Sequence, residues 1–422
     1  MHSKKLPFNV ATINEFRDRY AVAFTNFFNT LMIPFGIWFV YSFIAATTGL
    51  IRNNDYAIYS LAAVAIRNGG NPYAEFLTIV YSDGLAVNWG YVYPPFIATL
   101  LSLFLVLGTA GAKIVWAVLT TAGIFTTAFV LRRLGMVASL GAGWIAIALT
   151  QWPVAIDGFE QGQVGAMVLG LLAIFLLAMH LQYPKVAGIA LALAVHIKVT
   201  PILLAVLLID RRYARTRMAF IVSLIAVAAG VAFFGGISTW LYFLSSAPKT
   251  ASGGAQWLSP SNHAISKSIY MLCPALGMKT ALWIQHAIVA CGAFMVARDR
   301  RRTGTGCLER DFCRLTVLMF IASPIVWFHH ALWLLFAIVW CWNNNTSARS
   351  RTLIVVAVAA ICVGPYIGPA LCGRAMKELE IFEPLEFLLG ALSLWVLMAR
   401  KDSLFNEGSR GRPGGSTDTA LA

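Results

Sequence analysis

Charged residues are scarce in this chain of 422 residues, where Asp, Glu, Lys and Arg together make up 12%. Soluble domains carry about 25% charged residues, whereas 59% of the residues here are hydrophobic. A water-soluble protein of this length needs more charge to cover its surface, so the composition excludes that class. We predict a polytopic membrane protein of the all-α class, lying in the lipid bilayer.

Motifs for soluble cofactors are also missing. The sequence has no P-loop pattern, no GxGxxG after a strand, no CxxC pair and no DxD pair. The His and Cys spacings match no zinc motif. The 32 Lys and Arg outnumber the 18 Asp and Glu, but they lie in short clusters between apolar runs, a pattern that encodes membrane topology. We therefore expect no nucleic-acid partner, no cofactor and no metal.

Apolar runs of about 20 residues predict membrane-crossing helices. The clear ones are roughly 24–46, 112–131, 136–150, 163–181, 218–235, 280–297, 352–370 and 384–400. Two longer runs, 186–210 and 315–344, are interrupted near Pro201 and Pro324, and proline tends to end a helix. Each is predicted to be a hairpin of two short segments, and the run 94–108 to be interfacial or re-entrant. The result is about 12 crossings in one domain, 24–400.

Basic clusters set the predicted orientation of these crossings. They are Arg132-Arg133, 211–217, 298–314, 349–351 and Arg400-Lys401. The positive-inside rule places them in the cytoplasm, together with an N-terminal tail, 1–23, and a disordered C-terminal tail, 401–422. The outer side then receives a long first loop, 47–111, and a Ser/Gly/Pro-rich loop, 236–279.

Polar groups at the outer ends of these runs are the candidate site residues, because ionisable groups at membrane depth are costly. Asp55 could act as a general base or cap the helix that follows it. Lys198 could hold an anion or extend to the membrane surface. Gln163 and the pair His329-His330 could bind a phosphosugar, or could cap and pack. Because all of them fall on one side of the predicted topology, a single outer cleft for a lipid-linked phosphosugar is favoured.

Several short motifs occur one after another along the chain around these residues. They are the early Asp55, then Gly69-Gly70-Asn71-Pro72-Tyr73, Tyr93-Pro94-Pro95, Gly162-Gln163, Lys198-Val199-Thr200-Pro201, and Ser323-Pro324 followed by Trp327 and His329-His330. In this order and spacing the chain resembles glycosyltransferase family 87 of the GT-C superfamily, from about residue 50 to 335. That family includes polyprenyl-phosphate-mannose-dependent α-mannosyltransferases.

The resemblance implies a function and a set of residue roles. It implies inverting transfer of a hexose, with mannose as the default, from a polyprenyl-phosphate sugar to an envelope glycan or glycolipid. Transfer would occur on the extracytoplasmic side of the cell membrane. Asp55 would be the general base, and Lys198 and His330, with His329 beside them, would hold the donor phosphate. The expected substrate contacts are Arg52, Asn71, Tyr73, Tyr93 and Gln163.

Two departures from the family pattern leave the sugar open. Gly165 stands where members usually carry Asn, and His196 stands where a small apolar residue is usual. A pentose donor, as in arabinofuranosyl transfer, is therefore an alternative. A secondary transporter or flippase of lipid-linked sugars is a second alternative, because broken helices also build transporter sites. A non-catalytic assembly subunit is a third.

Overall fold

The computed structural model describes residues 44, 54–74, 76–80, 86–136, 153–253, 262–303, 307–345, 347–362 and 382–399. Several predicted features lie outside these ranges. They are the tails 1–23 and 401–422, almost all of the crossing at 24–46, the crossing at 136–150 apart from its first residue, and Arg52.

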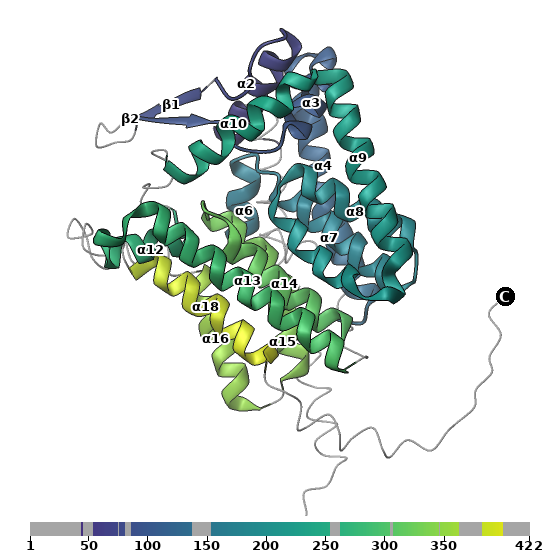
Figure 1. Cartoon of the computed structure of the whole chain (residues 1–422), viewed down its shortest axis with the longest axis vertical. Helices are drawn as coiled ribbons and strands as arrows, with labels where there is room; N and C mark the ends of the chain where they lie inside the picture. The colour runs from purple at the N-terminus through teal and green to yellow at the C-terminus, as the bar shows by residue number, and fades with distance from the viewer. Residues whose placement is uncertain are drawn as a thin grey trace, which may run out of the picture.

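The described part of the chain is almost entirely helical, as the predicted all-α class requires (Figure 1). Its α-helices are α2 (Asn54–Arg67), α3 (Pro95–Phe104), α4 (Gly108–Arg133), α6 (Pro153–Glu160), α7 (Gly165–His180), α8 (Pro184–Ile197), α9 (Ala214–Gly235), α10 (Ile237–Gly253), α12 (Ile265–Leu272), α13 (Gly277–Thr303), α14 (Leu308–Ala322), α15 (Leu335–Asn344), α16 (Ala348–Cys362) and α18 (Phe382–Ala399). Its 3₁₀ helices are η1 (Leu105–Leu107), η2 (Thr200–Ile209), η3 (Arg211–Tyr213), η4 (Pro274–Leu276) and η5 (Phe328–Leu334).

Three helical runs are long and apolar enough to cross a membrane: Pro95–Arg133, Arg211–Gly235 and Pro274–Arg302. In the first run, Gly108 at φ +74° separates α3 from α4, and α3 alone has ten residues. Shorter apolar helices include α7 and α8. The chain is therefore a polytopic membrane protein, while the count of about 12 crossings stays a prediction.

Both helix breaks that the prolines predict are present. α8 ends at Ile197, and Lys198 is extended at φ −149°, ψ 134° before η2 begins at Thr200. α14 ends at Ala322, and the chain becomes helical again only at Phe328, beyond Pro324. Proline removes a backbone donor and disfavours helix before it, which explains both interruptions. The side chains at these breaks are thereby released from the helix surface.

Small residues bring two central helices into close contact. A Cβ on Gly123 of α4 would lie 2.2 Å from the Ala166 carbonyl oxygen of α7, and a Cβ on Gly170 would lie 2.7 Å from the Gly123 Cα. Contacts this short leave room only for hydrogen at both positions. Close backbone approach through small residues is how helices associate in a membrane, where hydrophobicity alone does not separate protein from lipid.

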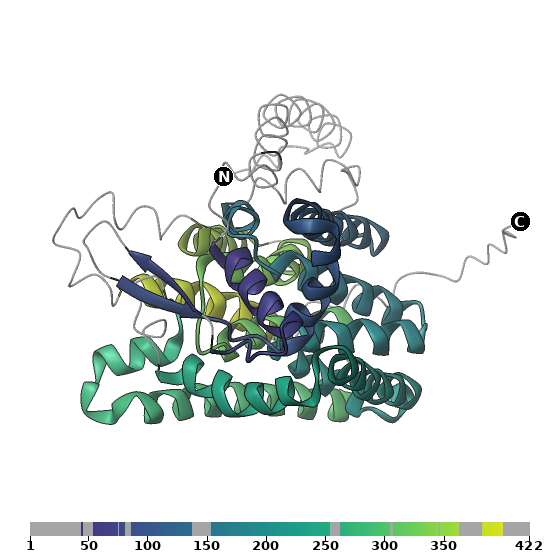
Figure 2. The ribbon, with the colours of Figure 1, turned by 90° about the horizontal axis from the view of Figure 1, so that it is seen from above.

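The predicted outer loops contain helices and strands. The first, 47–111, contains α2, α3 and an antiparallel hairpin of β1 (Phe76–Val80) and β2 (Ala86–Gly90), in which Phe76 pairs with Gly90. The second, 236–279, contains α10 and α12 among its described residues. Figures 1 and 2 show the hairpin, α2, α3 and α10 gathered at one end of the molecule.

Candidate active site

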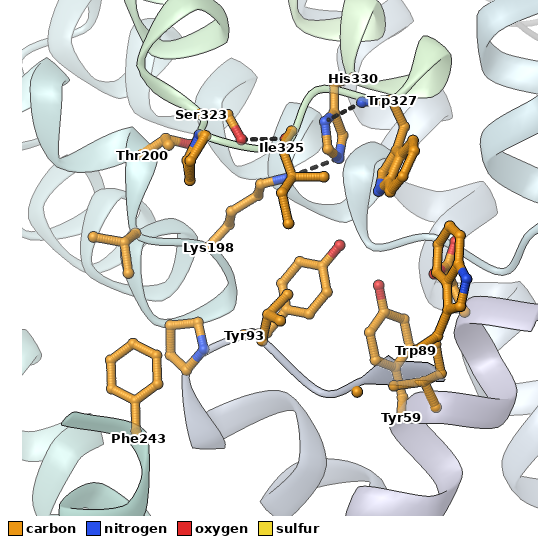
Figure 3. A pocket seen from close by; sticks show the side chains of 17 residues that line it. Tyr59, Trp89, Tyr93, Lys198, Thr200, Phe243, Ser323, Ile325, Trp327 and His330 are labelled. Atoms are coloured by element: carbon orange, nitrogen blue, oxygen red, sulfur yellow. Dashed lines mark hydrogen bonds between the residues drawn. The ribbon is translucent and has the colours of Figure 1, made fainter. Parts of the chain in front are cut away.

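A cavity of about 240 Å³ lies where the two helix breaks meet this end of the bundle (Figure 3). Its walls come from α2, the end of β2, the turn into α3, the two breaks and α10. The lining residues on which the chemistry depends are Asp55, Tyr59, Trp89, Tyr93, Lys198, Phe243, Ser323, Trp327 and His330. The candidates that the sequence places far apart therefore converge on one pocket.

The start of α2 fixes Asp55 at the cavity wall. The backbone N–H groups of Asp55 and Tyr56 both donate to the Gln161 carbonyl oxygen, at 3.1 and 3.2 Å. This contact requires Gly162, since a Cβ there would lie 2.7 Å from the Tyr56 Cβ and its φ is +71°. The glycine of the Gly-Gln motif thus allows α2 to dock, and the Asp55 side chain is 8% exposed.

Gln163 orients two tyrosines of the cavity. Its Oε1 accepts hydrogen bonds from the Tyr59 hydroxyl at 3.1 Å and the Tyr93 hydroxyl at 3.2 Å. Tyr59 follows Asp55 by four residues and so lies on the same face of α2. Gln163 is 2% exposed and does not line the cavity. Gln163 lies behind the two tyrosines, and these tyrosines line the cavity.

The two helix breaks are joined by a direct contact between Lys198 and His330. The Lys198 Nζ lies 2.7 Å from the His330 Nε2, and both side chains are buried. The Lys198 Nζ also lies 4.6 Å from the ring centroid of Trp333 and 5.5 Å from that of Tyr93. Among the described residues no carboxylate lies within ion-pair distance of Lys198.

The hydrogen bonds of His330 determine its tautomer. The Trp327 backbone N–H donates to His330 Nδ1 at 3.0 Å, so Nδ1 is an acceptor and the neutral ring carries its proton on Nε2. The Nε2–Nζ contact is then a hydrogen bond only when Lys198 is an uncharged amine that accepts. An anion in the cavity would stabilise the charged lysine instead, so the pair is arranged to respond to a bound anion.

The acid of the site is strongly desolvated. Burial raises the pKa of the Asp55 carboxyl above its usual 3.8; His329 and the Gln163 side chain lower it, Asp157 raises it, and Lys198 lowers it. A carboxylate with a raised pKa is a better base than one in water, provided that it is ionised at the working pH. Asp55 thus has the environment of a general base.

Aromatic rings form much of the cavity wall. The rings of Trp89 and Trp327 stack at a centroid distance of 4.9 Å and an angle of 22°. Tyr59 and Tyr93 meet edge to face at 5.2 Å. Phe243 closes the side formed by α10. Apolar faces with few polar groups are typical of pockets that bind organic ligands.

Not every predicted site residue reaches the cavity. His329 turns toward α6, where its Nδ1 lies 2.9 Å from Asp157 Oδ2, and it does not line the cavity. The Asn71 Oδ1 accepts from the Tyr73 backbone N–H at 2.9 Å, which stabilises the local turn. The Tyr73 hydroxyl donates to the Tyr93 carbonyl oxygen at 2.9 Å. Tyr73 therefore holds the backbone of Tyr93, and Asn71 holds the backbone of Tyr73.

Sequence reasoning missed Asn262, which shapes the second break from outside the motifs. Its Oδ1 accepts from the Val326 backbone N–H at 2.8 Å, and its Nδ2 donates to the Pro324 carbonyl oxygen at 3.3 Å. Phe243 was missed as well, because α10 was expected to be loop. Among the described ranges, no group of three or more His, Cys, Asp or Glu is placed to hold a metal ion.

A comparison with models of known families confirms the predicted resemblance. The model of glycosyltransferase family 87 matches residues 91–324, more than half of the 422 residues. A polyprenol-phosphate-mannose-dependent alpha-(1-2)-phosphatidylinositol mannoside mannosyltransferase of Mycobacterium tuberculosis is 25% identical over 327 residues, 73% of this chain and 74% of that protein. The solved structure of ArnT from Cupriavidus metallidurans bound to undecaprenyl phosphate aligns with 87% of this chain and 76% of that chain, at a TM-score of 0.42 and 12% identity.

Proposed function

Because the chain belongs to glycosyltransferase family 87, we propose that it transfers a hexose, by default mannose, from a polyprenyl-phosphate sugar to an envelope glycan or glycolipid. Transfer would occur on the extracytoplasmic side of the cell membrane. The observation that carries this proposal is Lys198, which is 9% exposed, lines the cavity and has no carboxylate partner among the described residues. Protonation of a buried lysine without a counter-ion is costly, and a phosphate monoanion in the cavity would remove that cost.

The donor phosphate would occupy the space beside Lys198 and His330. When it binds, Lys198 becomes an ammonium and donates to a phosphate oxygen, and the Nε2–H of His330 can donate to another. Both groups are held at the ends of broken helices, so they require little rearrangement. As the sugar leaves, negative charge grows on that phosphate, and preorganised donors stabilise it most where water is excluded.

Asp55 would activate the acceptor. In the transfer step the acceptor hydroxyl oxygen forms a bond to the anomeric carbon, the bond from that carbon to the phosphate oxygen breaks, and the hydroxyl proton passes to Asp55. Attack from the face opposite the phosphate inverts the anomeric configuration. The polyprenyl phosphate leaves with the electron pair. Asp55 returns its proton to solvent before the next turnover.

Mannose is proposed because the M. tuberculosis relative is a polyprenol-phosphate-mannose-dependent mannosyltransferase. The two departures from the family pattern do not carry sugar contacts. His196 Nε2 lies 3.0 Å from the Leu224 carbonyl oxygen of α9, and the Gly165 carbonyl oxygen accepts from Trp333 Nε1 at 3.3 Å. Neither residue lines the cavity. A pentose donor therefore stays in the experimental panel.

The proposal is tested by transfer from radiolabelled polyprenyl-phosphate-mannose to a membrane glycolipid extract, with purified protein in nanodiscs. We expect Asp55→Asn to reduce transfer by about 100- to 10,000-fold, the usual contribution of a general base. Donor binding and the melting temperature should change little. Glu309→Gln is the matched control, because Glu309 contacts His180 at the surface, far from the motifs.

The transporter alternative predicts a different result. Retained transfer by Asp55→Asn would refute the assignment of the base. Movement of intact donor across sealed vesicles, without transfer to any acceptor in a panel of mannosyl, glucosyl and arabinofuranosyl donors, would favour a flippase. Transfer of a pentose but not a hexose would keep the reaction and replace the sugar.

A further inference from the structure

A second, strongly basic cavity lies away from the active site, between η2, η3 and the last turns of α13. It measures about 610 Å³ and is lined by four arginines and one aspartate: Arg211, Arg212, Arg300, Arg301 and Asp210. Four positive charges against one negative charge leave a formal net charge of +3 on its walls. The predicted topology assigns these arginines to the cytoplasmic end of the bundle.

Internal partners account for only part of this charge. Arg212 is engaged by Asp210, with its Nε 2.5 Å from Asp210 Oδ2. Arg300 Nη1 donates to Asp311 Oδ2 at 2.9 Å. Within the described ranges, Arg211 and Arg301 have no ion-pair partner.

Arg300 distinguishes this cavity from an ordinary solvated cluster. It is 5% exposed, and its Nε and Nη2 have no hydrogen-bond partner among the described residues. A buried guanidinium with unused donors is costly. Arginine presents those donors in a planar fork that matches phosphate geometry. The cavity therefore has a buried cationic floor and exposed arginines at its rim.

An apolar groove continues directly from the basic cavity. It measures about 540 Å³ and shares four residues with the basic cavity, which are Val206, Ile209, Ala297 and Arg301. Ala293 and Phe294 extend it along α13. Ile209 is 45% exposed and Phe294 is 67% exposed, so the groove opens on an exposed apolar surface of the helices. Arginines next to an apolar groove match the two parts of one amphiphile, an anionic head group and an apolar chain.

We propose that this composite cavity binds an anionic phospholipid, with its phosphate between Arg211 and Arg301 and above Arg300. An acyl chain would lie along Val206, Ile209 and Phe294. Basic pockets between transmembrane helices on the cytoplasmic side are suited to anionic lipid head groups. A bound lipid would hold η2 in place. Because η2 begins two residues after Lys198, an occupied cavity would stabilise the segment that positions this lysine.

The test is native mass spectrometry of the purified full-length protein, titrated with phosphatidylglycerol or with phosphatidylcholine of the same acyl chains. We expect one phosphatidylglycerol to bind with clear preference over phosphatidylcholine. Arg211→Gln/Arg301→Gln should weaken that binding roughly thirtyfold, because each arginine near a membrane surface contributes about fivefold. The matched control is Arg132→Gln/Arg349→Gln, which removes two exposed arginines outside both cavities.

Ala297→Trp provides a second variant that does not depend on charge. Ala297 lines both cavities, so a large side chain there should displace the lipid while leaving every arginine in place. Equal affinity for the two lipids, or equal loss in the Arg132/Arg349 control, would overturn the proposal. Displacement of phosphatidylglycerol by millimolar inorganic phosphate would also overturn it, because the site would then hold free phosphate rather than a lipid.

Discussion

Buried basic side chains occur at both ends of the helical bundle, and the two ends treat them differently. At the arginine-rich end, Asp311 is 1% exposed as a side chain and lies within 4.0 Å of three arginines, two of which are also buried. At the motif end, Lys198 has a histidine and aromatic rings as neighbours but no carboxylate within that distance in the described structure. Removing the counter-ion of a buried charge destabilises a fold, whereas a buried basic group with no internal counter-ion indicates a ligand.

The difference also separates positive charge that sets topology from positive charge that serves chemistry. Arg314 donates to Asp299 at 2.9 Å and lies 4.8 Å from the ring centroid of Trp395. It joins α13, α14 and α18 and faces no cavity that contains a candidate base. Lys198 joins two helix breaks and lines the candidate active-site cavity together with Asp55. Substitutions at the two ends should therefore move different measurements.

The largest effect on stability is expected for Asp311→Asn. Removing one partner of a buried ion pair leaves the others uncompensated and costs about 3–5 kcal/mol. Arg300 and Arg314 would both lose their buried anion. The measurement is the free energy of unfolding in mixed micelles, with turnover per folded molecule as the second readout. Turnover per folded molecule should stay near the native value.

The control for Asp311→Asn is Glu309→Gln, two residues earlier in the same helix. Glu309 pairs with His180, whose side chain is 52% exposed, and a surface pair contributes about 0–1 kcal/mol. If both variants unfold equally easily, the arginine network is not a principal source of stability, and the contrast between the two ends is lost.

Lys198→Met is expected to impair transfer but not stability, the reverse of Asp311→Asn. The loss of one or two charge-assisted hydrogen bonds to a donor phosphate, about 1.5–3 kcal/mol each, should raise the KM for donor by about tenfold to more than a hundredfold. Stability should stay constant or rise, because a buried group without a counter-ion is replaced by an apolar one of similar length. Lys185→Met, at an exposed lysine in the first turn of α8, the helix that ends just before Lys198, is the control. A large loss of stability with an unchanged KM would make Lys198 a structural residue.

The pH dependence of transfer gives a smaller and more specific test. Asp55 can accept a proton only when ionised, and burial raises its pKa above 3.8, so kcat/KM should fall on acidification at a higher pH than for an exposed carboxylate. His329 lowers that pKa, so His329→Gln should move the acidic limb to still higher pH. The measurement is kcat/KM from about pH 4 to 8. A limb that does not move in His329→Gln would show that another group controls it.

Much of this contrast could be predicted from the sequence, because prolines and membrane topology leave local marks. Pro201 and Pro324 predict the two breaks, and the breaks place Lys198 and His330 at helix ends. A proline lacks a backbone donor and therefore tends to end a helix. This effect can be predicted without knowing which distant residues the helix contacts. The order of apolar runs then predicts that both helix ends lie on one side of the membrane.

What could not be predicted depends on contacts between distant residues. Lys198 and His330 are 132 positions apart, and no local sequence pattern predicts the 2.7 Å contact between them. His329 and His330 are adjacent, yet their rings lie at 89° to each other and only His330 lines the cavity. The role of Gly162 is visible only when α2 docks on it. Site residues could thus be identified by kind and position, but not by orientation.

The smallest effect is expected for Tyr93→Phe, which asks whether the motif end tolerates loss of one neutral hydrogen bond. The Tyr93 hydroxyl donates to Gln163 Oε1 at 3.2 Å, and a bond of this kind contributes about 0.5–1.5 kcal/mol. Tyr59 still donates to the same oxygen, so Gln163 stays in place and kcat/KM should fall only about two- to tenfold. The exposed Tyr183→Phe is the control and should leave transfer unchanged. A loss as large as that of Asp55→Asn would mean that the Tyr93 hydroxyl contacts the reacting sugar, which would move Tyr93 from the wall of the site into its chemistry.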